Sequence, residues 1–195
     1  MNKSKYFIAF VLTVFLTGCP ARILFPLFTE KDLVFNPALV GTWALEGDVY
    51  TFHKSGGTSY ELMHYTNEAA SDTAIFRAEL GKLGKFWFLD LFPESRALES
   101  HLNNGVYTHH LIFAHTISRV WFEGDSIRIS TLDDDWLRKM VNKKKLKIPY
   151  VHIKDRNAGE QLILTANTKE LQHLVTKYAD NTSAFPNPGV LHRVK

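Results

Sequence analysis

The chain contains one cysteine, Cys19, and its thiol is the most distinctive reactive group in the sequence. It follows Leu16-Thr17-Gly18, at the end of a run of apolar and hydroxyl-bearing residues over positions 6–16. Two lysines precede that run, so the N-terminus has the basic, apolar and small-residue regions of a secretory signal peptide. The run is shorter than the roughly 20 residues of a membrane-spanning helix. We therefore expect cleavage just before Cys19.

Leu16-Thr17-Gly18-Cys19 resembles the lipobox of bacterial lipoproteins. The resemblance implies that residues 1–18 are a signal peptide and that the Cys19 sulfur takes a diacylglyceryl group. It also implies a protein held in the bacterial cell membrane by lipidated Cys19 and facing the periplasm. Pro20 stands where an inner-membrane retention signal carries aspartate, which slightly favours the outer membrane. The alternative is an ordinary secretory peptide that happens to contain a cysteine.

The mature chain has no second cysteine, so its fold depends on its core rather than on a disulfide. With 45% hydrophobic and 22% charged residues, the composition is that of a globular protein. Loss of the signal peptide removes Lys3 and Lys5 and lowers the formal net charge from +3 to +1. We expect a lipidated N-terminal tether over 19–35 and a single domain over 36–195. Apolar residues in the tether predict that it packs on the domain or lies at the membrane surface.

Histidines and aspartates supply the other groups that could do chemistry. His109 and His115 would lie roughly 20 Å apart on one strand, and His110 and His115 would point to opposite faces, so a shared metal ion is not expected. The aspartates at 133–135 lack the spacing and glycine of a calcium loop. Nucleophile elbow, phosphate loop and zinc-helix motifs are all missing. We expect no enzyme, cofactor or metal site, although catalytic groups can also assemble from distant positions.

The densest basic run is Lys143-Lys144-Lys145-Leu146-Lys147. Such a run can contact anionic lipid head groups or nucleic acid, or can simply be the solvated end of a helix. A periplasmic location argues against nucleic acid as a partner.

Apolar residues from Gly41 onward recur with a period of two, and turn residues separate them about every ten positions. The pattern predicts a mainly β fold, an antiparallel barrel or sandwich of about eight or nine strands. Residues 86–89 are apolar on both faces, so another element should cover this strand from outside. The predicted strands are 42–46, 49–54, 59–66, 73–80, 86–92, 108–122, 125–131, 148–155 and 160–166.

Helices are expected outside this pattern. Asn167 and Glu170 have the spacing of a capping box and predict a C-terminal helix over 168–179. A second helix is expected over 133–145, with aspartates at its N-terminus and lysines at its C-terminus. A weaker pattern suggests a helix over 94–102.

Gly41-Thr42-Trp43 resembles the first strand of lipocalin-like (calycin) proteins. The resemblance implies an up-and-down barrel with Trp43 across its closed end and an arginine from a late strand over the indole. Arg119 and Arg156 are the candidates for that arginine. The Thr-Asp-Tyr turn of lipocalins is missing, and a helix between strands is a further departure. Alternatively, Trp43 is a plain core residue.

A barrel of this size is wide enough to hold one small ligand. Three alanines on or near the expected strands, at positions 74, 78 and 114, would leave room for a fatty acid or lipid fragment. The same side chains could instead fill the interior. In that case the domain would dock an envelope protein partner through its apolar N-terminal segment or the 143–147 face. The candidate ligand-lining residues are Tyr50, Phe52, Tyr60, Phe76 and Phe88.

We predict that Cys19→Ala prevents membrane attachment, because the substitution removes the sulfur that would carry the lipid. The variant should move from the membrane to the soluble fraction or persist as an uncleaved precursor. Fractionation and mass spectrometry of the mature N-terminus measure both outcomes. An N-terminus without an acyl chain in the wild-type protein would refute lipidation.

Overall fold

The computed structural model describes residues 19–66, 73–94, 111–155 and 159–194. The signal peptide expected over 1–18 and most of the helix expected over 94–102 lie outside these ranges. His109, His110 and Arg156 also lie outside them.

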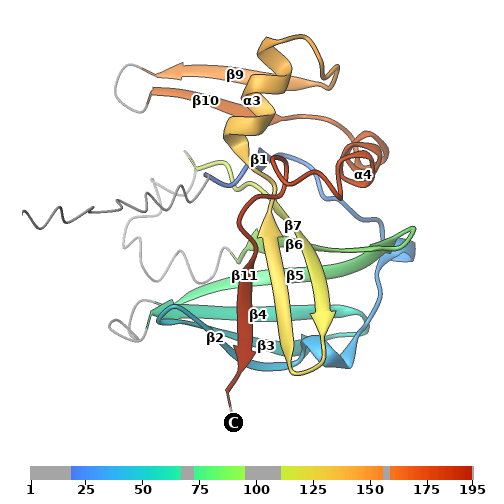
Figure 1. Ribbon diagram of the computed structural model, residues 1–195, viewed down its shortest axis with the longest axis vertical. Helices are drawn as coiled ribbons and strands as arrows, with labels where there is room; N and C mark the ends of the chain where they lie inside the picture. The colour runs from blue at the N-terminus through green and yellow to red at the C-terminus, as the bar shows by residue number, and fades with distance from the viewer. Residues whose placement is uncertain (1–18, 67–72, 95–110, 156–158, 195) are drawn as a thin grey trace, which may run out of the picture.

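Eight antiparallel strands close into a barrel (Figure 1). Each strand pairs with its neighbour in the order β11-β2-β3-β4-β5-β6-β7-β8, and β11 closes the circle by pairing with both β8 and β2. The fold is therefore mainly β, and the expected lipocalin-like barrel is confirmed. The strands are β2 (Gly41–Leu45), β3 (Asp48–Ser55), β4 (Ser59–Thr66), β5 (Ala74–Leu83), β6 (Phe86–Pro93), β7 (Thr116–Glu123), β8 (Ser126–Thr131) and β11 (Gly189–Arg193).

Residues 132–188 form an insertion between the last two barrel strands, above the barrel in Figure 1. It contains α3 (Asp134–Asn142), the hairpin of β9 (Tyr150–Asp155) and β10 (Gly159–Leu164), and α4 (Thr168–Lys177). The short strand β1 (Arg22–Ile23) pairs in parallel with β10 to make a three-stranded sheet. The strands predicted over 148–155 and 160–166 thus exist, but they lie outside the barrel.

Local signals explain where the two α-helices begin and end. The Asn167 and Glu170 side chains form the predicted capping box at the start of α4. The Asp133 carboxylate caps α3 by accepting from the Trp136 amide at 2.6 Å. Lys144, with φ of 55°, adopts the left-handed conformation just after α3, so this helix ends at Asn142, before the expected position 145.

Alternation along the barrel strands creates two hydrophobic clusters. The first lies inside the barrel and includes Trp43, Phe52 and Leu89. The second lies outside, between β6, β7, the insertion and the N-terminal segment. Phe88 belongs to this second cluster, with its ring 6.0 Å from that of Phe185. The predicted cover over the outer side of β6 is therefore confirmed.

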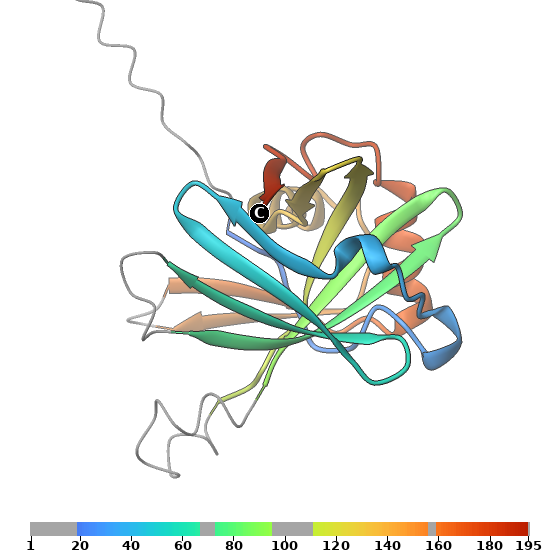
Figure 2. The same cartoon turned by 90° about the horizontal axis from the view of Figure 1, so that it is seen from below.

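The segment before β2 packs along the outside of the barrel (Figure 2). It includes two 3₁₀ helices, η1 (Glu30–Asp32) and η2 (Pro37–Leu39). Ile23 and Leu27 have no exposed surface. Phe28 lies so close to β5 that a Cβ atom at Gly81 of that strand would overlap the Phe28 ring. Ile23, Leu27 and Phe28 therefore pack against the domain, whereas Phe25 and Val34 stay exposed.

Trp43 lies in the barrel interior and is 1% exposed. Its indole nitrogen donates to the Leu39 carbonyl at 3.0 Å, and the guanidinium of Arg193 lies 4.2 Å from the ring centre. The arginine over the tryptophan therefore comes from β11. The Arg119 candidate is wrong, because its side chain projects outside the barrel, 4.5 Å from the Trp121 ring.

We predict that Trp43→Ala lowers the free energy of unfolding by roughly 3–5 kcal/mol, because it leaves a large cavity in the barrel core. Urea titration followed by circular dichroism would measure the loss. Val194→Ala removes methyl groups from a residue that is 48% exposed, so it should change stability by less than about 0.5 kcal/mol. Similar losses in both variants would contradict the core role of Trp43.

Candidate binding site

Four of the five predicted ligand-lining residues face the barrel interior. Phe52 and Tyr60 are fully buried there, and Tyr50 and Phe76 are partly buried in the same cluster. The prediction that Phe88 lines the barrel interior is wrong. The inward residues of β6 are Trp87, Leu89 and Leu91, so Phe88 points to the opposite face and into the outer cluster.

Side chains fill the part of the barrel around Trp43. Leu39 and Leu80 have 1% or less of their surface exposed and pack in the same cluster as Trp43. The Tyr60 ring stacks on Phe35 at 5.4 Å, and its hydroxyl donates to the Asn36 carbonyl at 3.0 Å. This part of the interior is therefore a packed core.

The three alanines contribute unequally to the interior. Ala78 is fully buried inside the barrel, and Ala74 is half-buried on the same strand. Ala114 lies in the connection before β7, outside the barrel strands. The alanines therefore do not form one common surface for an acyl chain.

A polar cluster lies near the turn between β2 and β3. The Asp48 carboxylate is 3.6 Å from the His64 Nε2 and accepts from the Tyr50 hydroxyl at 3.5 Å. The rings of Tyr50 and His64 lie 4.7 Å apart. Burial is the main cause that raises the pKa of Tyr50 to about 12, and the negative charge of Asp48 adds to it. This cluster makes the barrel interior polar near the β2–β3 turn.

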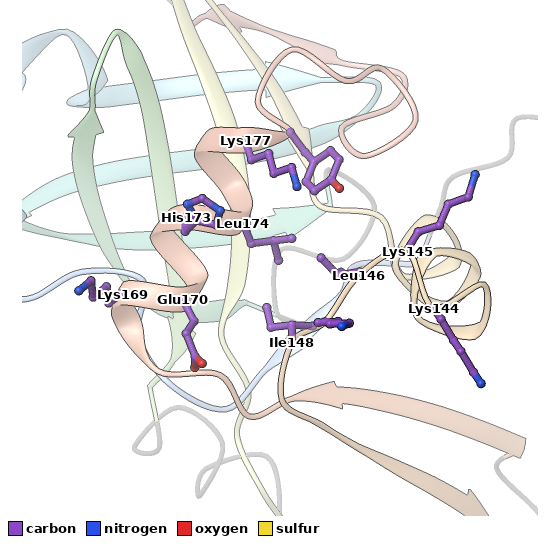
Figure 3. Close-up of a pocket in the computed structure, with 11 residues that line it drawn as sticks. Lys144, Lys145, Leu146, Ile148, Lys169, Glu170, His173, Leu174 and Lys177 are labelled. Atoms are coloured by element: carbon purple, nitrogen blue, oxygen red, sulfur yellow. The ribbon is translucent and has the colours of Figure 1, made fainter.

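A groove of about 530 Å³ lies outside the barrel, between α4 and the loop that follows α3. In Figure 3, Leu146, Ile148 and Leu174 point into it. Tyr178 and Lys177 lie at one end, and the Lys177 ammonium is 5.3 Å from the Tyr178 ring centre. The groove is large enough for a small ligand and has an apolar floor.

Basic residues line both walls of this groove. Within the described residues, none of the five groove lysines forms an ion pair. The one acidic residue, Glu170, uses its carboxylate to accept from the Asn167 amide at 3.0 Å. In Figure 3, two of the lysines point outward from the far rim. Five lysines against one carboxylate therefore leave the lining of the groove with an excess of positive charge. The lysines are Lys144, Lys145, Lys147, Lys169 and Lys177.

The sequence singled out only one wall of this groove, the basic run at 143–147. The other wall comes from α4, where Lys169, His173 and Lys177 are spaced by four residues. That spacing places the three side chains on one helix face. The four-residue spacing of these basic residues can be read from the sequence, but only the tertiary fold brings the two walls together.

His115 forms a buried hydrogen bond with Asp90. Its Nδ1 lies 2.8 Å from the Asp90 carboxylate, whose second oxygen accepts from the Leu27 amide at 2.8 Å. Glu79 is the residue opposite Asp90 on β5, and burial raises its pKa. The pair fastens the N-terminal segment to the barrel. Across the ranges that the structure describes, no group of three or more metal-ligating side chains has the arrangement of a metal site.

Comparison with known proteins gives no match, whether with models of protein families, with curated proteins or with solved structures. In the part of the chain that the structure describes, no helix is long and apolar enough to cross a membrane.

We predict that Tyr50 ionises later than an ordinary tyrosine. Its pKa of about 12 in the folded state lies above the value of about 10 in an unfolded chain. Between these values the folded state binds more protons, so stability falls as the pH rises. Tyr50→Phe should remove this part of the alkaline loss of stability and the latest rise in phenolate absorbance. Tyr150→Phe, at an exposed site, should leave both in place. If Tyr150→Phe removes the alkaline loss of stability and the latest rise in absorbance, the assignment to Tyr50 is wrong.

Proposed function

We propose that this chain is a lipid-anchored lipoprotein of the bacterial envelope that binds an anionic amphiphile in the groove between α4 and the 144–148 loop. The ligand class is an acyl chain that ends in a carboxylate or a phosphate. The lipobox at positions 16–19 supports the anchor. The observation that carries the binding site is that five lysines, without ion-pair partners in the described residues, line the walls of a groove with an apolar floor.

The floor of the groove suits the apolar part of such a ligand. Leu174 is buried, whereas Leu146 and Ile148 are half-buried and keep surface toward the groove. Covering apolar surface stabilises a complex by about 25 cal/mol for each Å² removed from water. A hydrocarbon chain therefore gains more here than a small polar anion would.

The rim of the groove suits the charged end. Clustered ammonium groups repel one another, and an anion between them relieves this repulsion. Lys147 and Lys177 come from opposite walls, so a head group between the walls would meet both. The groove thus offers charge complementarity at its edge and hydrophobic contact at its base.

A ligand inside the barrel is the second candidate. Tyr50 and Phe76 keep some exposed surface, and the Asp48 carboxylate beside them supplies a polar contact. The packed core around Trp43 limits such a ligand to the part of the barrel near the β2–β3 turn. The third hypothesis is docking of an envelope protein. It keeps the 143–147 face, whereas the N-terminal segment offers a smaller surface because Ile23, Leu27 and Phe28 are buried in the fold.

We predict that residues 20–195, expressed without the anchor, bind a pyrene-labelled fatty acid at one site. Lys147→Glu with Lys177→Glu should weaken binding about tenfold or more, because two attractions become repulsions. A matched alcohol without the carboxylate should bind more weakly than the acid. Pyrene fluorescence measures both affinities.

The control is Lys54→Glu with Lys82→Glu, which makes the same charge change at two exposed barrel residues. It should leave the affinity for the fatty acid unchanged. Equal weakening in both double variants, or no saturable binding, would refute the groove as the site. Loss of binding in Tyr50→Ala with Phe76→Ala, but not in the lysine variants, would favour the barrel.

A further inference from the structure

Cys19 is held by the fold rather than by a free linker. Its carbonyl accepts from the Asp134 amide at the N-terminus of α3, at 2.9 Å. Pro20 forms an isolated β-bridge with Asp133, and the Ala21 amide donates to the Leu132 carbonyl at 2.8 Å. The residue that would carry the lipid is thus fixed to the surface of the domain.

The residues that follow are equally fixed. Ala21, Ile23 and Leu27 have no exposed surface. Ile23 and His115 exchange two backbone hydrogen bonds, at 3.1 and 2.7 Å. If residues 19–35 were a free tether, they could span about 60 Å in extended form. Bound in this way, they provide no spacer between Cys19 and the domain.

We infer that the mature domain lies directly on the phospholipid bilayer, an inference that rests on the lipidation proposed above. The surface around Cys19 and the N-terminus of α3 faces the head groups. Arg22 and Asp135 are exposed there, and Arg138 bridges Asp134 and Asp135 at 2.9 and 3.1 Å. Guanidinium groups donate well to phosphate oxygens. This mixed-charge surface suits contact with head groups rather than insertion among acyl chains.

This orientation also places the groove. Helix α3 joins the anchor to the loop that lines the groove, and its nine residues rise only about 13 Å. The wall of the groove that follows α3 therefore lies near the anchored end of that helix, where an amphiphile from the bilayer could reach it. The β5–β6 turn lies on the opposite side of the molecule from the start of the N-terminal segment in both views (Figures 1 and 2).

The test uses the full-length, processed lipoprotein in vesicles of phosphatidylethanolamine and phosphatidylglycerol that contain nitroxide-labelled head groups. Because Cys19 is the only cysteine, Asp135→Cys and Lys85→Cys each introduce one site for a fluorophore. Both positions are exposed, at 61% and 78% of the side chain. We expect loss of fluorescence at position 135 and none at position 85.

The matched control inserts a flexible Gly/Ser spacer after Cys19, which should abolish the difference between the two positions. Equal quenching at both positions without the spacer, or stronger quenching at position 85, would overturn direct seating on the bilayer. Mass spectrometry of the N-terminus distinguishes a lipidated protein that does not lie on the bilayer from a protein that is not lipidated. An N-terminus without acyl chains would refute the anchor itself, and the seating with it.

Discussion

The outer face of β6 and β7 has to be covered, and most of the chain outside the barrel serves that purpose. β6 is apolar on both faces, with Leu89 directed inward and Phe88 outward. Burial of one such side chain stabilises the fold by about 1.5–3 kcal/mol relative to exposure. The insertion over 132–188 and the N-terminal segment together supply the partner surface. The second core therefore exists because one barrel strand cannot face water on either side.

The covered outer face of β6 also contains a carboxylate, and its hydrogen bonds determine how the N-terminal segment packs there. Asp90 is 2% exposed, and a carboxylate buried to this extent requires hydrogen-bond partners. The Leu27 amide and the His115 ring supply them, each at 2.8 Å from a different carboxylate oxygen. Phe28 then fits against Gly81, where a larger residue would collide with its ring. A polar contact and a steric contact thus set a single register for the N-terminal segment.

The sequence predicts the barrel well because period-two alternation is a local property. The strand expected over 59–66 matches β4 in full. β11 was missed because Gly189–Arg193 is short and follows two prolines. The direction of Phe88 was missed because a strand that is apolar on both faces has no alternation to set its register. The groove could not be predicted as a site, since its walls come from segments whose contact depends on the whole insertion.

Helix α3 links the two features proposed to carry function. At its N-terminus, one backbone amide donates to the Cys19 carbonyl and another donates to the capping carboxylate of Asp133. Its C-terminus leads into the lysines that line the groove. Acidic groups at the start of a helix and basic groups at its end both favour the helix dipole. The same charge order that stabilises α3 therefore separates an arginine-paired acidic end beside Cys19 from a lysine-rich end at the groove. In the proposed orientation, an anionic amphiphile would be attracted to the groove end of α3 rather than to the acidic end beside Cys19, so the two proposals place opposite demands on the two ends of one helix.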